Sequence, residues 1–508
     1  MYQPSREQFR ELATQGNLIP VCRRLLADFE TPLSAYTKIR GQGESFLLES
    51  VEGGEHLGRY SFVGCSPRSV VRQKGHRVDV LEQGRVVDSF TVDPAAPVSD
   101  LSSKLVRDGL AVVERVMGRY RPVDVPDLPR FTGGAIGFIG YEFIHDVEPT
   151  VPRPPVDELD TPTLYYLIAD EVLVFDRTAQ TLTIVVNAST DGVSVDEAYE
   201  DAIGEIERLV SLLEQPIQGR PASFLTEAVE LPFVSNQTPE QFQERVRKSK
   251  DYIRSGDIFQ VVGSQRFSAP VHAQPLDVYR AVRSVNPSPY MFLLELEGFS
   301  LVGASPEIHV RCESHRVEIR PIAGTRRRGK TPEEDQALEK ELLADPKERA
   351  EHVMLIDLAR NDVGRVCDFG TVRVNDLMII ERYSHVMHIV SQVEGRLRAD
   401  CSTYDLMRAT FPAGTLTGAP KIRAMQIISE LEQTTRGPYG GCVGYFSFSG
   451  NLDCCITIRT ALLKDGKAYV QAGGGWVHDS TPEGEFLETV NKSKAMRHAL
   501  ALAEDFGK

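Results

Sequence analysis

Three short segments occur twice along the chain in the same order, and this repetition is the strongest constraint on its fold. Residues 46–49, 63–67 and 133–138 are matched by residues 292–295, 302–306 and 440–445. One match could arise by chance, but three in order predict a duplicated unit rich in β-strands. The second copy has Glu307 where the first has Arg68. We therefore expect the second copy to carry the chemistry and the first to be regulatory and scaffolding.

The length of the chain and a break in its patterning predict two lobes. A chain of 508 residues can bury a large core. Residues 215–237 contain three prolines and mixed polarity, so they form the best candidate boundary. Thr238 then offers an N-cap, and Pro239 suits the first position of a helix. We predict an N-terminal lobe of residues 1–230 and a second lobe of residues 238–508.

Local patterning gives coarse expectations for the first half. Residues 1–40 have the character of a polar helix and a loop, and offer little chemistry. Residues 98–117 are expected to form a helix. Residues 131–141 read as a strand punctuated by glycines, where small residues allow another backbone to approach closely.

Composition excludes several classes of function. The formal net charge is −15 and no basic domain offsets it, which argues against a nucleic-acid partner. Neither a run of about 18 apolar residues nor the apolar segment of a signal peptide is present, so no membrane association is expected. The eight cysteines include no Cys-x-x-Cys pair, so neither zinc nor a redox couple is predicted. We expect a cytoplasmic protein.

Two pairs of glutamates are candidates for a metal site. Glu348 and Glu351 lie three residues apart in a predicted helix, and Glu485 and Glu488 repeat this spacing near the C-terminus. Residues three apart share one helix face, and two carboxylates on one face can form half of a site for a divalent cation. Each pair is equally typical of a solvated helix face. Spacing alone leaves both interpretations open.

Other segments suggest that an anion binds. Residues 320–329 form a predicted turn with three consecutive arginines, which could meet an anion with guanidinium groups and backbone N–H groups. Gly473, Gly474 and Gly475 could donate N–H groups without obstruction by side chains, or could form only a tight turn. His388 stands in an apolar run, where a buried core histidine is the plainer interpretation.

Several blocks of sequence resemble the chorismate-utilising enzymes. These blocks are residues 321–324, 351–362, 385–395, 415–425 and 471–475, and the similarity runs in order from about residue 238 to 500. Among these enzymes the chain is most similar to the large, chorismate-binding subunits of anthranilate synthases. The resemblance implies an α+β fold with two lobes, in which large antiparallel β-sheets pack as a sandwich with flanking helices.

The resemblance also implies roles for individual residues. Glu351 and Glu488 match positions that hold Mg²⁺, with Glu348 and Glu485 beside them. Glu307 resembles the general acid that protonates the departing ring hydroxyl, and His388 resembles a histidine near the reacting ring. Gln260 and Thr415 are further catalytic positions, and the role of Thr415 is left open. The positions that match chorismate contacts are Gly324, Thr325, Tyr439, Arg459, Gly473, Gly474, Gly475 and Lys492.

Two positions separate the related activities. Ala323 stands where the similar aminodeoxychorismate synthases have a lysine nucleophile. Alanine cannot form the covalent adduct that such a lysine forms with the substrate. Gln260 stands where isochorismate and salicylate synthases have a lysine that activates water. The implied reaction is amination of chorismate by ammonia with loss of pyruvate to give anthranilate, a lyase reaction that is the first step of tryptophan biosynthesis.

The implied partners are a glutaminase and an inhibitor. Residues 440–444 fit the pattern around a glutaminase nucleophile, but no His-x-Glu follows, so we interpret Cys442 as a strand residue. A separate glutamine amidotransferase subunit, in a heterotetramer, should supply ammonia. Feedback inhibition by tryptophan is implied by two segments that contain Ser50, Pro289, Tyr290 and Met291. These segments could also be only core strands.

The alternatives are of two kinds. The chain could be an aminodeoxychorismate synthase or an aminodeoxyisochorismate synthase that stops before pyruvate is lost. It could also be a non-catalytic subunit that senses tryptophan. Retention of Glu307, Glu351, Arg459 and Glu488 disfavours the non-catalytic alternative.

Overall fold

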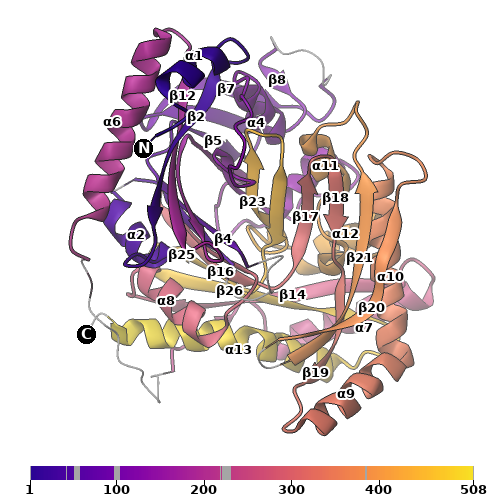
Figure 1. Ribbon diagram of the computed structural model, residues 1–508. Coiled ribbons are helices and arrows are strands. Elements are labelled where there is room, and N and C mark those ends of the chain that lie inside the picture. Colours follow the sequence, from indigo (N-terminus) through magenta and orange to yellow (C-terminus); the bar gives the residue numbers. More distant parts are fainter. Residues whose placement is uncertain are drawn as a thin grey trace.

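The computed structural model describes residues 2–41, 43–50, 58–96, 103–217, 219, 230–383 and 386–506 (Figure 1). Its α-helices are α1 (Arg6–Leu12), α2 (Pro32–Ile39), α4 (Gly109–Met117), α5 (Ile144–Val147), α6 (Val195–Leu213), α7 (Pro239–Arg254), α8 (Pro275–Val285), α9 (Pro332–Ala344), α10 (Pro346–Gly364), α11 (Thr403–Thr410), α12 (Lys421–Glu432) and α13 (Pro482–Phe506). Two short 3₁₀ helices are η1 (Tyr141–Phe143) and η2 (Gly414–Leu416). None of the helices in the described ranges is long and apolar enough to cross a lipid bilayer.

The strands form two large sheets, each of 13 strands within the described residues. Sheet A contains β1 (Tyr2–Gln3), β2 (Leu18–Leu26), β3 (Ser45–Glu49), β4 (Tyr60–Cys65), β11 (Glu171–Asp176), β12 (Thr181–Ser189), β13 (Val234–Ser235), β14 (Gln260–Pro270), β15 (Tyr290–Leu296), β16 (Phe299–Ser305), β22 (Gly418–Ala419), β25 (Thr460–Lys464) and β26 (Lys467–Trp476). Sheet B contains β5 (Ser69–Lys74), β6 (Arg77–Glu82), β7 (Arg85–Val92), β8 (Leu105–Val106), β9 (Gly134–Ile139), β10 (Leu164–Ala169), β17 (Ile308–Glu313), β18 (Arg316–Ile319), β19 (Ile322–Arg327), β20 (Arg373–Arg382), β21 (Val386–Arg396), β23 (Cys442–Ser447) and β24 (Leu452–Ile456).

The two sheets pack against each other through an apolar layer. Phe46 and Phe62 of sheet A belong to the same buried cluster as Phe138 and Leu167 of sheet B. Helices α1, α2, α6, α8 and α13 cover the outer face of sheet A, and α4, α10 and α11 lie against sheet B. Helix α12 contacts β14 and β22 of sheet A. The expected α+β sandwich of large antiparallel sheets with flanking helices is therefore confirmed.

The order of strands in sheet A is symmetric about its centre. It reads β1-β2-β12-β11-β4-β3 and then β15-β16-β25-β26-β14-β13, so each strand of the first half has a counterpart in the second. At the centre β3 pairs with β15, and Leu47 lies opposite Leu293, its match in the repeated segment. In sheet B, Gly137 of β9 lies opposite Gly444 of β23, again its match. A duplicated unit related by a two-fold axis would produce this arrangement.

Both sheets contain strands from both halves of the chain. The boundary between residues 230 and 238 therefore separates no sheet, and the division into two lobes stays a prediction. Within the predicted linker, residues 218 and 220–229 lie outside the described part of the chain. The helix expected after it is α7, whose N-cap Thr238 and Gln241 form the reciprocal capping bonds that the sequence predicted.

Two local expectations for the first half need correction. Residues 1–40 are not only helix and loop, because β2 (Leu18–Leu26) runs through them. Its first five residues are all buried, although Pro20 and two arginines obscure the pattern in the sequence. The helix expected over residues 98–117 is shorter: β8 precedes it, and α4 begins only at Gly109 with Asp108 as N-cap. Residues 98–102 of that expectation lie outside the described residues.

Candidate active site

A cavity of about 630 Å³ lies between sheet strands and the helices α10 and α13. Its size is typical of small-molecule sites. All of the residues predicted to be catalytic, to bind substrate or to bind metal line it: Gln260, Glu307, Gly324, Thr325, Glu348, Glu351, His388, Thr415, Tyr439, Arg459, Gly473, Gly474, Gly475, Glu485, Glu488 and Lys492. Positions more than 200 residues apart in the sequence thus meet in one place. The cavity is our candidate active site.

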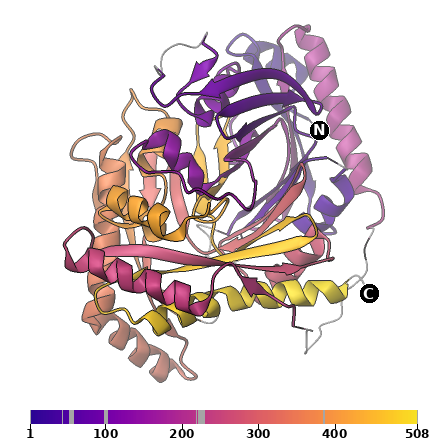
Figure 2. The same cartoon turned by 180° about the vertical axis from the view of Figure 1, so that it is seen from behind.

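Two helices bring the four glutamates to the cavity. Helix α10 begins at Pro346, and α13 runs beside α7 across β14 and β26 (Figure 2). In the first turns of α10 and α13, Glu348 and Glu485 precede Glu351 and Glu488 by three residues. This spacing keeps each pair on one face of its helix. Both faces line the same cavity.

The electrostatic surroundings of these carboxylates favour a cation. Burial raises the pKa of Glu351 and of Glu485, and in each case a neighbouring glutamate raises it further. Gln260 Nε2 donates to Glu351 over 3.2 Å, and Lys492 pairs with Glu488 at 2.7 Å. In the described part of the chain, no three or more side chains of His, Cys, Asp or Glu converge closely enough to form a metal cluster. Mg²⁺ is commonly held by only one or two carboxylates together with water and substrate, so Glu351 and Glu488 fit such a site.

Glu307 is placed to act as an acid. It follows β16, and only 8 % of it is exposed. Burial raises the pKa of its carboxyl group to about 8, despite the opposing effects of the Thr415 side chain, Arg459 and Lys492. At neutral pH the group is therefore protonated and can donate a proton inside the cavity.

Arg459 is placed to bind an anion. It has a left-handed backbone conformation with φ of 50°, which follows β24 and directs the chain into β25. Burial lowers the pKa of the Arg459 guanidinium, and the Glu307 carboxyl group acts in the opposite direction. Its guanidinium group forms neither an ion pair nor a hydrogen bond with any described residue, and a free guanidinium suits a carboxylate.

His388 of β21 has a defined protonation pattern. Its Nδ1 lies 2.9 Å from the carbonyl oxygen of Gly324 and 3.1 Å from Thr325 Oγ1. A carbonyl oxygen only accepts, so Nδ1 carries the proton and Nε2 is the basic nitrogen. Burial lowers the pKa of His388, which keeps the ring neutral and able to accept a proton.

The glycines keep the cavity open. A Cβ atom on Gly474 would lie 3.1 Å from Glu485 Oε2 and 3.3 Å from Glu488 Oε1, and one on Gly475 would lie 2.3 Å from Gln260 Nε2. The tight turn considered for residues 473–475 is wrong, because they lie in β26 and pair with β14. Past Val470 no other described strand pairs with the second edge of β26, so N–H groups there remain able to face a ligand.

Comparison with known proteins gives the family. A family model described as chorismate binding enzyme matches residues 91–498. The chain belongs to this family.

Individual chorismate-binding enzymes are similar over nearly the whole chain. "Anthranilate synthase component 1" of Pseudomonas putida is 48% identical, with 98% of this chain and 99% of that protein covered. The protein of the same name from Acetivibrio thermocellus is 45% identical, with the same coverage. The crystal structure of anthranilate synthase component I from Streptococcus pneumoniae TIGR4 has a TM-score of 0.75 at 35% identity, covering 94% of this chain and 99% of that one. The resemblance inferred from the sequence is confirmed.

A buried ion pair supports the cavity of this chorismate-binding enzyme from behind. Arg436 pairs with Glu432 at 2.7 Å and donates to the carbonyl oxygen of Leu416 at 2.9 Å. Glu432 also accepts from the backbone N–H of Ser264 at 2.9 Å. The pair therefore ties η2 to β14 and fixes Thr415 of η2 in the cavity wall. Their i, i+4 spacing at the end of a helix was the only signal in the sequence.

Sequence reasoning assigned no role to two polar cavity residues and misjudged the three arginines. Lys347 and Gln471 also line the cavity. Residues 322–327 form strand β19 rather than a turn, with only Gly324 at a left-handed φ of 63°. The arginines pair with acidic side chains of α9 and α10: Arg326 with Glu341, Asp345 and Glu348, Arg327 with Glu334, and Arg328 with Asp335. They organise the wall of the site and are not free to bind an anion.

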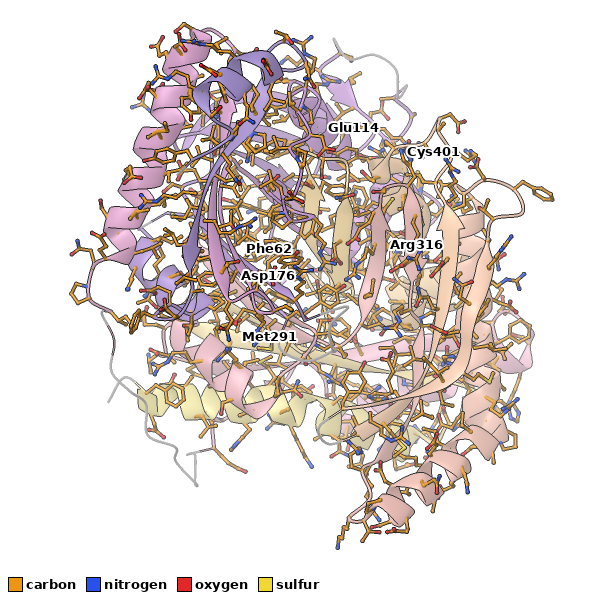
Figure 3. The ribbon with its side chains drawn as sticks, viewed as in Figure 1. Phe62, Glu114, Asp176, Met291, Arg316 and Cys401 are labelled. Atoms are coloured by element: carbon orange, nitrogen blue, oxygen red, sulfur yellow. The ribbon has the colours of Figure 1, made fainter. Side chains whose placement is uncertain are left out.

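The residues expected to bind tryptophan line a separate, smaller cavity. Ser50, Pro289, Tyr290 and Met291 surround about 40 Å³ between β3, β15 and sheet B. Figure 3 labels Phe62 and Met291 of this cavity, one from each half of the chain. Ser50 Oγ is buried with no hydrogen-bond partner among the described residues. Tyr290 and Met291 lie in β15, whereas Ser50 directly follows β3 and Pro289 directly precedes β15. The segments therefore enclose a space at the ends of two core strands, and the binding of tryptophan there stays a prediction.

Proposed function

We propose that this chain is the chorismate-binding subunit of an anthranilate synthase and catalyses the first step of tryptophan biosynthesis. The observation that carries the proposal is the single cavity in which a protonated Glu307, an unpaired Arg459 and two pairs of carboxylates converge. The similarity to proteins named anthranilate synthase component 1 supports the same function.

The substrate would be held through its two carboxylates. Arg459 and the free N–H groups of β26 suit one of them, because a guanidinium fork and backbone donors match a carboxylate. Glu351 and Glu488 would hold Mg²⁺, with Glu348 and Glu485 beside them. The ion, when bound, would supply positive charge that offsets the charge of the glutamates and would bind the second carboxylate. Tyr439, Thr325 and Lys492 would complete the contacts.

The chemistry follows from two groups. Ammonia attacks ring carbon C2 of chorismate while the C–O bond at C4 breaks, and Glu307 donates its proton to the departing hydroxide, which leaves as water. The ammonium group formed at C2 loses its extra proton to water. Nε2 of His388 then accepts the proton from C2 as the enolpyruvyl C–O bond breaks and the ring becomes aromatic. Enolpyruvate leaves, takes up a proton and becomes pyruvate. A neutral His388 and a protonated Glu307 have the protonation states that these steps require.

The choice of ammonia over related nucleophiles depends on two residues of the cavity. Ala323 offers no amine that could form an adduct. The Gln260 amide is bound to Glu351 and cannot activate water as a base. Both features support anthranilate synthase over aminodeoxychorismate and isochorismate synthases.

A partner, an inhibitor and a location complete the proposal. A glutamine amidotransferase subunit would deliver ammonia, since the only expected glutaminase-like cysteine, Cys442, is buried in β23. Tryptophan would bind the cavity beside Ser50, which joins strands of the two halves, and would thereby inhibit the enzyme. A cytoplasmic location suits the eight cysteines, all of which are free thiols.

The test is an assay of the purified chain with chorismate, Mg²⁺ and ammonium, with and without tryptophan. Anthranilate is followed by fluorescence, and pyruvate is measured separately. We expect equal amounts of both products, loss of activity with a chelator and inhibition by tryptophan. Product without pyruvate would assign an aminodeoxyisochorismate synthase, and absence of turnover would assign a non-catalytic sensing subunit.

A further inference from the structure

A second, smaller cavity lies directly behind Glu307. About 30 Å³ of it is open to molecules of the size of water, which is enough for one or two of them. Glu307, Thr415 and Leu355 line both this rear cavity and the candidate active site. They therefore form the wall between the two spaces. His309, Thr410 and Asp362 lie on the far side of the rear cavity, among mostly apolar neighbours.

His309 presents an unused acceptor in this space. Only 3 % of His309 is exposed, and burial lowers its pKa to about 3, so the ring is neutral. Its Nε2 lies 3.3 Å from Thr410 Oγ1, and that hydroxyl donates to the carbonyl oxygen of Leu406 at 3.0 Å. The hydroxyl hydrogen is thus used, and Nε2–H must be the donor to Thr410. Nδ1 is left as a bare lone pair, with no partner among the described residues.

Thr415 presents a second polar atom without a partner. Its Oγ1 is buried and forms no hydrogen bond with any residue in the described ranges. Its side chain lies close enough to Glu307 to act as a weak donor that lowers the pKa of that carboxyl group, but the two groups fall outside ordinary hydrogen-bond geometry. A buried polar atom that binds nothing is destabilising, so two such atoms beside a buried acid point to a bound ligand.

We propose that the rear cavity holds ordered water that His309 and Thr415 bind and that donates a hydrogen bond to Glu307. This inference rests on the role of Glu307 in the proposed function. The bare Nδ1 takes one hydrogen of the water, so the other hydrogen is directed to the Glu307 carboxyl group. That bond holds one carboxyl oxygen at the rear and leaves the acidic O–H for the substrate in front. His309 is then a positioning residue for Glu307.

The surrounding charges define the expected pH effect. Arg459 and Lys492 face Glu307 from the front, and Lys421, paired with Asp362 at 2.9 Å, lies beyond His309. None of these groups is changed by a substitution at His309. A water that donates to Glu307 favours its carboxylate, so loss of that water should raise the pKa of Glu307. The alkaline limb of the rate profile should then move to higher pH.

The test compares the wild-type chain with two variants whose new side chains are nearly equal to each other in size. His309→Leu removes the acceptor, and His309→Asn keeps an amide oxygen close to the position of Nδ1. With ammonium as nitrogen source, we expect His309→Leu to lower kcat about three- to tenfold with KM changed by less than about twofold. Its alkaline limb should shift upward, and His309→Asn should stay close to the wild type. Circular dichroism establishes that both variants are folded.

A high-resolution crystal structure of the wild-type chain supplies an independent readout. We expect density for water within hydrogen-bond distance of His309 Nδ1 and Thr415 Oγ1. A dry cavity, or identical rates and pH profiles for the Leu and Asn variants, overturns the inference. Failure of the wild type to make anthranilate would contradict the proposed function instead, and the density in the cavity would still decide whether the water is bound.

Discussion

At the scale of single residues, Glu307 owes its expected role to burial. In the sequence it is one acidic residue after a Ser-Pro pair, and its first-copy counterpart is Arg68. In the structure the surrounding protein raises its pKa to about 8, several units above an ordinary glutamate. Arg68 instead forms a 2.7 Å ion pair with Asp170. Equivalent positions of the repeat therefore carry a buried acid, Glu307, in the second half and a paired arginine, Arg68, in the first half.

Replacing Glu307 should affect catalysis and not binding. Glu307→Gln keeps the shape but removes the transferable proton, so kcat should fall about 10²- to 10⁴-fold while KM changes little. In the wild type, activity per unit of free ammonia should be full below pH 8 and fall as pH rises through about 8, because the acid must be protonated. Steady-state fluorescence assays measure both. A variant that retains most of its kcat would contradict the role of Glu307.

At the scale of elements, α10 and α13 decide where the carboxylates meet. Each helix begins with proline, and Asp345 caps α10 by accepting from the N–H groups of Lys347 and Glu348. The cap fixes the first turn of α10. The first turns of the two helices carry Glu348 and Glu485, and Glu351 and Glu488 lie about one turn further along. A Glu-x-x-Glu pair becomes half of a site only because another helix supplies the opposite half.

The glutamates of the two helices should differ from their exposed neighbour. Glu351→Gln and Glu488→Gln should each raise the Mg²⁺ concentration for half-maximal activity by about tenfold or more, since each removes one of two carboxylate ligands. Glu483→Gln is the matched control, because it lies in the first turn of α13 but is exposed and does not line the cavity. Titration of Mg²⁺ in the assay and by calorimetry measures the effect. Equal behaviour of all three variants would count against the metal site.

The pairing of β3 with β15 places the cavity beside Ser50 between the two halves. Ser50→Leu should fill space beside the unpaired Ser50 hydroxyl and raise the inhibition constant for tryptophan at least about tenfold, while kcat without tryptophan stays unchanged. Ser61→Ala is the control, because Ser61 is buried in the adjacent β4 but does not line the cavity. Inhibition curves at fixed chorismate provide the measurement. Unchanged sensitivity of Ser50→Leu would remove the basis for this site.

At the scale of the whole molecule, the two halves are joined within both sheets and through buried charge. Arg408 of α11 pairs with Asp108, the cap of α4, at 2.8 Å, and neither side chain is more than 7% exposed. Removing one partner of such a pair leaves an uncompensated buried charge.

The buried pair should matter far more than an exposed one. Arg408→Met should lower the free energy of unfolding by about 3–5 kcal/mol. Arg254→Met, which breaks the exposed pair of Arg254 with Asp251, should cost less than about 1 kcal/mol. Urea denaturation of both variants gives the comparison. A cost for Arg408→Met as small as that of the control would mean that Asp108 is stabilised in another way.

Shared sheets also predict cooperative unfolding. Trp476, the single tryptophan, lies in β26 of the second half, whereas circular dichroism reports on both halves. The urea transitions followed by Trp476 fluorescence and by circular dichroism should coincide, because neither half has a complete sheet alone. A fragment of residues 1–230 should fail to fold, since β3 and β9 would lose their partners β15 and β23. Two separate transitions would support independent lobes.

The fold class could be predicted because repeated segments and ordered blocks carry that information, and the residues singled out in those blocks line one cavity, while their roles stay predictions. Prediction from the sequence failed where one pattern was compatible with two structures. Three consecutive arginines looked free until α9 and α10 placed acids against them. Three glycines looked like a turn, but β14 holds them in a strand. Strand β2 was hidden by Pro20 and by Arg23 and Arg24, neither of which is buried.

What the sequence alone determined is local: the helix starts, the glycine positions, the glutamate spacing and the duplicated strands. The first three depend on backbone preferences and side-chain periodicity within about ten residues, and the duplicated strands are recognised because short local segments recur in the same order. The tertiary structure decided which charges are paired, which are free and which are buried. Pairing and burial depend on contacts between residues hundreds of positions apart, such as Arg408 with Asp108 and Gln260 with Glu351. For this reason the acidity of Glu307 and the bare nitrogen of His309 became visible only in the folded chain.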